Sequence, residues 1–330
     1  MSKVTILGSG TWGTALANLL ASKREDVTLY SRFKEEAELY DSTRVHPHLP
    51  GARINDSIKF SWKLEEALKG AEFVVFASPS PYIRETARNV APYVNKDMIF
   101  ITVAKGIEAG SHMTMSEIIQ DELGKDYKVA ALSGPTHAEE VSLLLPTVIV
   151  SACEDEEVAK KVQALFATNF MRVYINKDIK GVELCGALKN IIALAAGFGD
   201  GLGFGDNCKA ATITRGLAEM TRLGVAMGCN PLTFSGLAGI GDIVVTATSR
   251  HSRNNNAGRL LGQGKSLEET LKEIGMVVEG INALVAAKEL SQEYNVEMPI
   301  VDAVYAAVYE GVRPMDAVSA LFARNLKSEL

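Results

Sequence analysis

The chain has 330 residues, which exceeds what one ordinary hydrophobic core supports, so two domains are expected. Its 47% hydrophobic and 22% charged residues are typical of an ordinary globular protein. The formal net charge of -6 provides no global basic field, so neither nucleic acid nor an anionic membrane is expected as a partner.

Cysteine spacing and the apolar runs indicate a cytoplasmic protein. The four cysteines include no CxxC pair, so neither a metal site nor a disulfide framework is expected. The N-terminus MSKVTILGSG enters a strand pattern directly, without the apolar core of a signal peptide. The most apolar of the other stretches, residues 141–153, is short and interrupted by Pro146, so no membrane span is expected.

The first part of the chain alternates short apolar runs with helical patterns. The runs that predict buried strands are residues 4–7, 27–30, 73–77, 99–103, 129–132 and 148–150. Helical patterns at residues 14–23 and 114–123 lie between them. This alternation predicts an α/β Rossmann-like domain over residues 1–178, with a mainly parallel sheet and helices on both faces.

Beyond residue 178, strand-like runs become rare and helical patterns dominate. They include residues 266–274, 281–294, 299–311 and 316–327. We therefore predict an all-α domain over residues 179–330. The glycine-rich stretch GFGDGLGFGD at 197–206 is interpreted as a small-residue turn between two helices.

A glycine motif opens the chain. Gly8, Gly10 and Gly13 have the G-x-G-x-x-G spacing, after the first predicted strand and before a helix. Gly8 permits a tight turn, Gly10 lets the backbone approach a pyrophosphate, and Gly13 allows close helix packing. The helix N-terminus favours an anion, so the motif predicts a dinucleotide cofactor, NADP or NAD.

The end of the second predicted strand bears on the choice of cofactor. It reads Tyr30-Ser31-Arg32, where an NAD site usually carries Asp or Glu for the ribose hydroxyls. Arg32, together with Lys34, suits the 2′-phosphate of NADP. A solvated basic strand end has the same sequence, so both cofactors stay open.

Polar residues also follow later strands, at 78–81, 104–106 and 133–138. In open α/β sheets, ligands bind outside the carboxyl ends of the strands. Lys105 is therefore a candidate to hold an anion or an oxygen of the substrate, the alternative being a solvated lysine. His137 is a weaker candidate for a general base, because loop histidines are more often polar surface.

Residues 236–264 join Asp242 to a loop that is rich in hydrogen-bond donors. Ser252 is placed to cap the helical pattern that follows, and Arg253 and Asn254 come directly after it. An arginine fork, a capping hydroxyl and free amides at a helix start predict a phosphate site. The alternative is a polar loop between helices.

Lys189 lies in ELCGALKNIIALAAG, a helical pattern that is apolar on nearly every side. A lysine is almost never fully buried without a partner. We expect Asp242 to be its carboxylate partner and Lys189 to transfer a proton; a lysine that extends to the surface is the alternative. Asn190, about 100° further round the helix, is expected to be structural.

Six segments in order resemble the NAD(P)-dependent glycerol-3-phosphate dehydrogenases of bacterial type. They are GSGTWGTALA at 8–17, VAKGIE at 103–108, LSGPTHAEEV at 132–141, ALKNIIALAAG at 187–197, GIGDIVVTATSRHSRN at 239–254 and VVEG at 277–280. The resemblance runs over nearly the whole chain. It implies reversible hydride transfer between NAD(P)H and dihydroxyacetone phosphate, giving sn-glycerol 3-phosphate for glycerophospholipid synthesis, and a homodimer.

The resemblance also implies roles for individual residues. Lys189 matches the proton-transferring residue, with Asp242 beside it. The positions that match substrate contacts are Lys105, Gly134, Thr136, Lys189, Asp242, Ser252, Arg253 and Asn254. Those that match cofactor contacts, with the three glycines, are Thr11, Trp12, Arg32, Phe33, Lys105, Ala138, Arg253, Val277 and Glu279. Many relatives carry a second basic residue where this chain has Phe33, so NADP and NAD both stay open.

Two other functions remain as alternatives at this point. A related β-hydroxyacid dehydrogenase would share the Rossmann half and the helical lysine but would bind a carboxylate. A dinucleotide-sensing protein without turnover would keep the glycine loop but would have no need for Lys189, Asp242 and Arg253 together.

Overall fold

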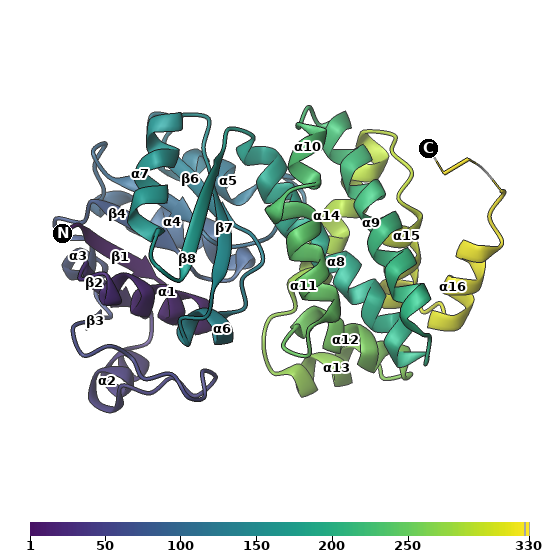
Figure 1. Ribbon diagram of the computed structural model, residues 1–330, viewed down its shortest axis with the longest axis horizontal. Coiled ribbons are helices and arrows are strands. Elements are labelled where there is room, and N and C mark those ends of the chain that lie inside the picture. Colours follow the sequence, from purple (N-terminus) through teal and green to yellow (C-terminus); the bar gives the residue numbers. More distant parts are fainter. Residues whose placement is uncertain (327, 330) are drawn as a thin grey trace. The chain divides into compact units, whose positions relative to one another are not determined.

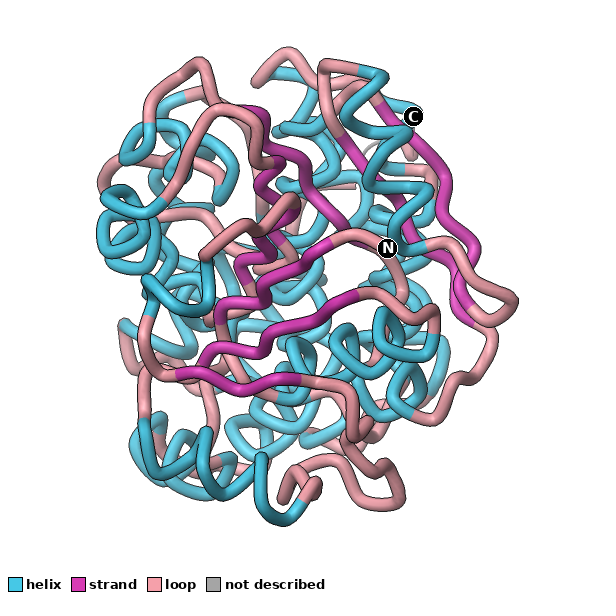
Figure 2. The backbone as a smooth tube through the Cα atoms, turned by 90° about the vertical axis from the view of Figure 1, so that its left-hand side faces the viewer, coloured by secondary structure: helices cyan, strands magenta, loops and turns pink. Residues whose placement is uncertain are grey.

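The predicted strands join into a single sheet. Within residues 1–326 and 328–329, which the computed structural model describes, eight strands lie in the order β3-β2-β1-β4-β5-β6-β7-β8. They are β1 (Lys3–Leu7), β2 (Asp26–Tyr30), β3 (Lys59–Ser61), β4 (Phe73–Phe76), β5 (Ile99–Thr102), β6 (Lys128–Ser133), β7 (Thr147–Ala152) and β8 (Met171–Asn176). Neighbouring strands, magenta in Figure 2, are parallel except for β6 with β7. The predicted mainly parallel sheet is confirmed.

Two strands at the edges of the sheet were not predicted. β3 has three residues, too few to produce a clear apolar run. β8 alternates buried and exposed residues along its first four positions, as expected for a strand with one solvated face. Both signals are weaker than the continuous apolar runs of the central strands.

Helices cover both faces of the sheet. They are α1 (Thr11–Ser22), α2 (Lys34–Thr43), α3 (Leu64–Leu68), α4 (Ile83–Val90), α5 (Met115–Leu123), α6 (Ala138–Ser142) and α7 (Glu156–Phe166). Along β4, Phe73 and Val75 join a core with residues of α1 and α7. Val74 and Phe76 join a second core with residues of α4 and α5. Burial on both sides explains why the strand carries no polar alternation.

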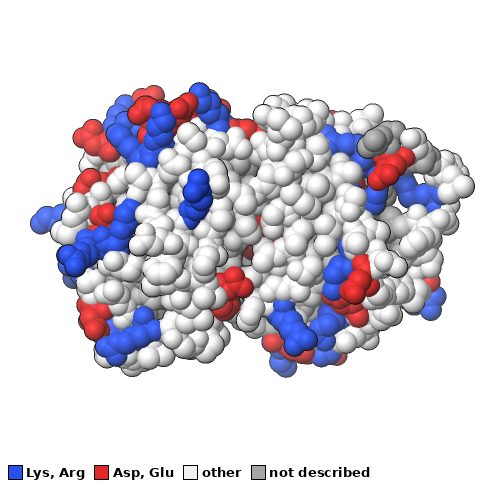
Figure 3. All heavy atoms as spheres, in the orientation of Figure 1, with Lys and Arg blue, Asp and Glu red and all other residues white. Residues whose placement is uncertain are grey.

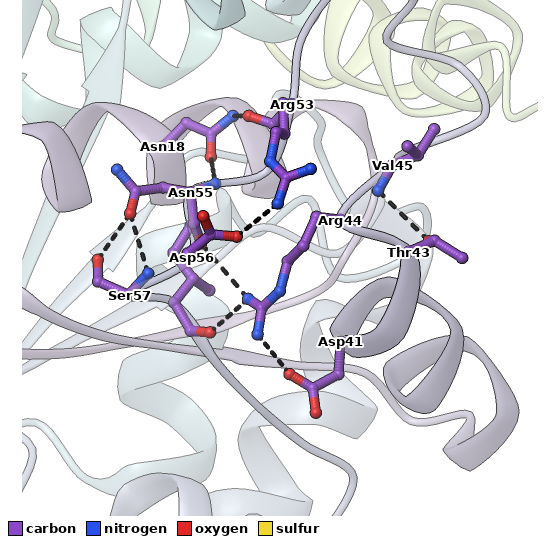
Figure 4. A network of polar contacts seen from close by, with 10 residues as sticks. Asn18, Asp41, Thr43, Arg44, Val45, Arg53, Asn55, Asp56 and Ser57 are labelled. Carbon is purple, nitrogen blue, oxygen red and sulfur yellow. Dashed lines mark hydrogen bonds and ion pairs between the residues drawn. The ribbon is translucent and has the colours of Figure 1, made fainter.

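A long connection, residues 44–58, leads from α2 to β3 and is held by the polar contacts drawn in Figure 4. Arg44 donates to the carbonyl oxygen of Ile58 at 2.8 Å. Asn18 of α1 donates to the carbonyl oxygen of Arg53 at 3.1 Å and accepts from the N–H of Asn55 at 2.9 Å. These bonds fasten the connection to α1 and satisfy backbone groups outside regular structure.

The second part of the chain is helical, as predicted (Figure 1). Its helices are α8 (Ile179–Gly201), α9 (Asp206–Ala226), α10 (Pro231–Phe234), α11 (Asp242–Thr248), α12 (Arg253–Gly262), α13 (Leu267–Ile274), α14 (Glu279–Glu293), α15 (Pro299–Tyr309) and α16 (Pro314–Phe322). The helix predicted over 316–327 ends at Phe322, and its last predicted residue, Lys327, lies outside the described residues.

Glycines bring α8 and α12 into close contact. A Cβ on Gly197 would lie 2.1 Å from the carbonyl oxygen of Asn255, and one on Gly201 would lie 2.2 Å from that of Arg259. A Cβ on Gly258 would in turn lie 2.0 Å from a carbonyl oxygen of α8. No real Cβ fits at these distances, so the two backbones approach this closely only because all three residues are glycine.

The interpretation of residues 197–206 as a turn is therefore wrong for its first half. α8 continues to Gly201, and residues 202–205 make the connection to α9. Glycine is a poor helix former, so its density suggested a turn. Packing against α12 outweighs that local preference.

Internal contacts divide the chain into two compact units, each described by itself. Unit 1 consists of residues 1–105 and 113–183, and unit 2 consists of residues 106–112 and the chain from Leu184 onward. The division predicted between residues 178 and 179 lies at the start of α8, whereas the contacts divide the helix itself after Glu183. A continuous helix gives no sequence signal for the residue at which its packing partners change.

Two helical stretches have the length and apolar composition of a membrane span, residues 179–201 and 231–248. In the most apolar part of the first stretch, 94% of the residues are buried, as in the core helix of a globular protein. The corresponding share is 44% in the second stretch. Length and composition are weak evidence in such cases, so the absence of a membrane span stays a prediction.

Acidic and basic side chains lie beside each other on the face shown in Figure 3. Among the ion pairs of unit 1, wherever they lie on its surface, Arg84 pairs with Asp121 at 2.6 Å and with Glu122 at 2.8 Å. Lys96 pairs with Asp126 at 2.8 Å. Interspersed charges of both signs agree with the modest net charge of the chain.

Candidate functional site

The glycine motif of unit 1 has the geometry that its spacing predicts. Gly8 has a φ of 121°, in the region that favours glycine, and a Cβ there would lie 2.9 Å from the backbone of Ala77. A Cβ on Gly13 would lie 2.0 Å from the carbonyl oxygen of Gly8. Around Gly10, by contrast, no atom lies within 4 Å of the Cβ position. The turn is therefore tightly packed at Gly8 and Gly13 and leaves open space beside Gly10.

The start of α1 is suited to an anion. Its N-cap residue, Gly10, has no side chain to accept from the amides of the first turn, and no acidic residue lies in that turn. Thr11 and Trp12 occupy the first two helical positions, whose N–H groups have no acceptor within the helix. Strands β1 and β4 are neighbours, so this loop lies at the switch point where open α/β sheets bind ligands.

The residues after β2 carry both a cation and a carboxylate. Arg32 is exposed and its guanidinium lies 5.1 Å from the ring centroid of Phe33, which is also exposed. Glu36, on α2, accepts hydrogen bonds from the hydroxyls of Ser9 and Ser31. Its carboxylate therefore joins the glycine loop to the end of β2.

Lys105, Gly134 and Thr136 gather where β5 and β6 end. Lys105 Nζ donates to the carbonyl oxygen of Gly134 at 3.0 Å, and Thr136 Oγ1 donates to the same oxygen at 3.1 Å. Gly134 has a φ of 148°, and a Cβ there would lie 3.2 Å from Ile149 Cα. The three predicted substrate residues of unit 1 thus form one cluster.

Two neighbours extend this cluster. The hydroxyl of Ser133 is buried and has no hydrogen-bond partner among the described residues. Ala138 begins α6, and His137 is its N-cap residue. A buried hydroxyl that lacks a protein partner is suited to a ligand or a water molecule.

Lys189 is buried in unit 2, with 6% of its surface exposed. Its Nζ donates to Asp242 Oδ1 at 2.9 Å and to Thr246 Oγ1 at 2.6 Å. Asp242 is 1% exposed, and Thr246 Oγ1 also lies 2.6 Å from the backbone carbonyl oxygen of Asp242. The predicted Lys189–Asp242 partnership is confirmed, and the alternative of a lysine that reaches the surface is excluded.

Thr246 was not among the predicted site residues. It lies four residues after Asp242 on α11, which places both side chains on one side of the helix. That spacing was the available signal, because a helical partner of Asp242 is expected at this interval. Sequence alone does not distinguish it from the many threonines that bond to their own backbone.

A short π-helical segment, Leu237–Gly241, precedes Asp242. Within it, a Cβ on Gly239 would lie 1.9 Å from the carbonyl oxygen of Phe234. Such segments are rare and often mark functional sites. Here the tight packing at Gly239 sets the entry into α11 and hence the position of its first residue, Asp242.

The start of α12 has the cap that the sequence predicts. Ser252 is the N-cap residue, and its Oγ accepts from the N–H of Asn255 at 3.1 Å. Arg253 is exposed and donates to the carbonyl oxygen of Val277 at 2.9 Å. The predicted cofactor residues Arg253 and Val277 are therefore in contact, and Glu279 begins α14 two residues later.

Asn254 and Asn190 connect three helices of unit 2. Asn254 Nδ2 donates to Asn190 Oδ1 at 2.9 Å, and Asn254 Oδ1 accepts from the N–H of Gly280 at 2.8 Å. Asn190 thus supports the side chain of Asn254, and the structural role expected of it stays a prediction. The side chain of Asn254 already has partners within the unit, and its role toward substrate stays a prediction.

No group of three or more His, Cys, Asp or Glu side chains that would hold a metal occurs in the described part of the chain. The four cysteines, all described, are free thiols. The expected absence of a metal remains a prediction.

Comparison with known families matches both parts of the chain. Residues 3–159 match the family described as the NAD-dependent glycerol-3-phosphate dehydrogenase N-terminus. Residues 178–319 match the family described as the NAD-dependent glycerol-3-phosphate dehydrogenase C-terminus.

Individual relatives cover the full length. A glycerol-3-phosphate dehydrogenase [NAD(P)+] 2 from Lactobacillus delbrueckii subsp. bulgaricus is 53% identical and covers 100% of this chain and 99% of its own. A glycerol-3-phosphate dehydrogenase [NAD(P)+] from Bacillus subtilis is 47% identical, with coverages of 100% and 96%. The crystal structure of glycerol-3-phosphate dehydrogenase from Coxiella burnetii has a TM-score of 0.93, 36% identity, and coverages of 98% and 99%.

Proposed function

Because the chain belongs to the NAD-dependent glycerol-3-phosphate dehydrogenase family, we propose that it interconverts dihydroxyacetone phosphate and sn-glycerol 3-phosphate with NAD(P). It is an oxidoreductase that acts on a CH–OH group. Its product serves glycerophospholipid synthesis. The observation that carries the mechanism is the buried Lys189–Asp242–Thr246 cluster of unit 2.

Lys189 is the proton donor in this proposal. Reduction of a ketone places negative charge on the carbonyl oxygen, and a buried ammonium directed at that oxygen donates the proton to it. Asp242 and Thr246 both accept hydrogen bonds from Nζ and so orient it, and the carboxylate of Asp242 balances its charge. In the reverse direction, the neutral amine accepts the proton from the alcohol.

The phosphate of the substrate is bound at the start of α12. The guanidinium of Arg253 and the backbone amides of the first turn are suited to a dianion, and Ser252 holds that turn in place. Asn254 fixes α12 against α8 and α14 through its hydrogen bonds to Asn190 and Gly280. Lys105, Gly134 and Thr136 are the substrate residues of unit 1.

The cofactor is assigned to unit 1, the dinucleotide-binding domain predicted over residues 1–178, and catalysis to the helical domain predicted over 179–330. The open space beside Gly10, the uncapped start of α1 and the buried, unpartnered hydroxyl of Ser133 fit a dinucleotide. By the family resemblance, the residues expected to hold it are Gly8, Gly10, Thr11, Trp12, Gly13, Arg32, Phe33, Lys105, Ala138, Arg253, Val277 and Glu279. When bound, the reduced nicotinamide supplies the hydride.

Both NADP and NAD fit the residues after β2. Arg32 supplies a cation for a 2′-phosphate, whereas Phe33 provides no second charge. Glu36 brings a carboxylate to Ser9 and Ser31, which is the type of group that accepts from ribose hydroxyls in NAD sites. The proposal therefore assigns use of both cofactors.

The proposal extends to a cytoplasmic homodimer, as the family resemblance implies. Light scattering on the purified chain measures its mass in solution. Twice the mass of the chain supports the dimer, and the mass of a single chain contradicts it.

The deciding test is an absorbance assay. We expect nicotinamide absorbance to fall when dihydroxyacetone phosphate is added to the protein with NADPH and, in a separate reaction, with NADH. β-Hydroxyacids with the oxidised cofactors serve as the control for the related dehydrogenase class. No turnover with either reduced cofactor would overturn the enzymatic function, and faster turnover of hydroxyacids would reassign the substrate.

A further inference from the structure

Glu183 is a buried carboxylate in the first turns of α8, with 5% of its surface exposed. It accepts a hydrogen bond from the N–H of Ser116 at 2.8 Å and another from the Ser116 hydroxyl. Thr114, the residue before α5, lies 3.4 Å from the Ser116 hydroxyl through its own hydroxyl oxygen. These donors lie at the N-terminus of α5, where the backbone amides have no acceptor within the helix.

Burial of this carboxylate costs free energy, which the hydrogen bonds from the start of α5 partly offset. Burial raises the pKa of Glu183 to about 7, and the nearby Glu117 carboxylate acts in the same direction. The hydrogen bonds from Ser116 oppose that shift because they stabilise the charged form. Glu183 is thus a desolvated carboxylate that is held by hydrogen-bond donors at the start of α5.

The position of Glu183 in the chain gives the contact its significance. It is the last residue of unit 1 before the unit boundary, which falls inside α8. Lys189 follows six residues later on the same helix, about 9 Å along its axis. The helix that carries the proton donor therefore begins in the unit assigned to the cofactor.

The remainder of α8 is held within unit 2. Gly197 and Gly201 pack against the backbone of α12, and Asn190 bonds to Asn254. Lys189 bonds to Asp242. These contacts fix the position of Lys189 in its own unit, and Glu183 binds the same rigid helix to α5 in unit 1.

We propose that Glu183 is a positioning residue for the reaction. By binding the start of α5, it fixes the first turns of α8, and because α8 is one continuous helix, the rotation of those turns sets the direction in which Lys189 presents its proton. The inference rests on the proposed function, because it concerns the same transfer of hydride and proton. It assigns Glu183 no contact with substrate or cofactor.

The expected effect is on the rate of the chemical step. A displacement of about 1 Å far from the chemistry can reduce a rate by about 100-fold. Binding of the cofactor depends on the glycine loop and the end of β2, which Glu183 does not contact. Loss of the anchor should therefore reduce kcat while leaving the Kd of NADPH nearly unchanged.

The test compares three substitutions in the full-length chain. Glu183→Ala should reduce kcat for dihydroxyacetone phosphate by about tenfold or more, with the NADPH Kd changed by less than about twofold. Glu183→Gln should recover kcat to within about threefold of wild type, because its amide oxygen still accepts from the Ser116 N–H. Glu183→Asp keeps the charge but shortens the side chain, and should remain as slow as Glu183→Ala.

Glu219→Ala is the matched control. Glu219 is equally buried and binds the N–H groups of Ile300 and Val301 at the start of another helix, α15. Glu219→Ala should lower Tm by about as much as Glu183→Ala does. Its kcat, measured well below Tm, should stay near the wild-type value. A drop in kcat confined to the Glu183 variants distinguishes positioning from general stability.

Three results decide between the alternatives. If Glu183→Ala keeps kcat within about twofold of wild type, or if both alanine variants lose kcat equally, Glu183 is only structural. If Glu183→Ala does not fold, Glu183→Asp slower than Glu183→Gln supports positioning and equal rates overturn it. Failure of the wild-type protein to turn over would instead overturn the proposed function.

Discussion

A buried lysine is stable only where its charge is compensated, and the carboxylate of Asp242 compensates that of Lys189. Asp242 and Thr246 lie one turn apart on α11 and both bond to Lys189 Nζ. Removing an ammonium from water costs far more than the surrounding apolar helix returns. Such a cluster supports the proposed role of Lys189 in proton transfer.

Lys189→Ala tests the assigned role. A positioned acid contributes about 10² to 10⁴ in rate, so kcat should fall by that factor, while the Kd of NADPH should stay close to wild type. Steady-state kinetics and fluorescence titration with NADPH measure the two quantities. Lys288→Ala, which removes a lysine paired with Asp302 elsewhere in unit 2, is the control and should leave kcat unchanged.

Survival of most activity in Lys189→Ala would contradict the assignment. A parallel loss of NADPH binding would also contradict it, since Lys189 would then act on the cofactor side.

At the scale of elements, the contact of α8 with α12 connects the catalytic lysine to the predicted phosphate site. The two helices meet through backbone atoms at Gly197, Gly201 and Gly258. Helices packed this closely leave little room for relative displacement, because interiors are close-packed and tolerate small volume changes poorly. Lys189 and the proposed phosphate site at the start of α12 are thereby held on one closely packed pair of helices.

Gly197→Ala should separate this pair. Its added methyl group would lie 2.1 Å from a carbonyl oxygen of α12, and overpacking of this kind typically costs about 1–3 kcal/mol or more of stability. Thermal or urea unfolding followed by circular dichroism measures the loss. The variant should also have a higher KM for dihydroxyacetone phosphate, because the added methyl group displaces the start of α12.

Gly199→Ala is the matched control on the same helix. A Cβ there would meet its nearest atoms at 3.8 Å, which is ordinary van der Waals contact. The change should be neutral or stabilise by up to about 1 kcal/mol, because alanine is the better helix former. Equal destabilisation by both substitutions would show that glycine content, and not the α8–α12 contact, determines the effect.

For the whole molecule, buried carboxylates make stability depend on pH. Burial raises the pKa of Glu183 to about 7 and that of Glu219 to about 7, both above the usual value of 4.5. The folded state therefore binds these protons more tightly than the unfolded state does. Their contribution to stability is fully present below pH 4.5 and is lost as pH rises through about 7.

Exposed ion pairs act in the opposite direction at lower pH. Hydrogen bonds from Lys160 and Lys177 lower the pKa of Glu156 to about 2. Stability from such a group is present above pH 4.5 and is lost as pH falls toward 2. Between pH 5 and 8, the buried carboxylates should therefore dominate the pH dependence.

Glu219→Gln isolates one of these groups. The free energy of unfolding of wild type should fall relative to that of the variant as pH rises from 5 to 8, by up to roughly 3 kcal/mol. Denaturant unfolding of both proteins at several pH values measures the difference. A difference that stays constant over this range would show that Glu219 does not change its protonation there.

The sequence by itself determined the features that depend on local patterns. Continuous apolar runs predicted the six central strands, because strands buried on both faces need no polar alternation. The spacing of Gly8, Gly10 and Gly13 predicted the tight turn between β1 and α1, because the positive φ of Gly8 and the contact of Gly13 with Gly8 both arise within this short segment. A lysine in an apolar helix predicted both its own burial and its need for a carboxylate.

Tertiary structure alone decided the features that depend on partners distant in the chain. Thr246 joined Lys189, Glu183 joined Ser116, and Gly197 met Asn255, and none of these pairs has a local signature. The glycines of α8 are weak helix formers and suggested a turn, but a close helix partner kept them helical. Packing between distant segments outweighs local preference here because it buries whole helix faces, whereas propensity contributes only about 1 kcal/mol for each glycine.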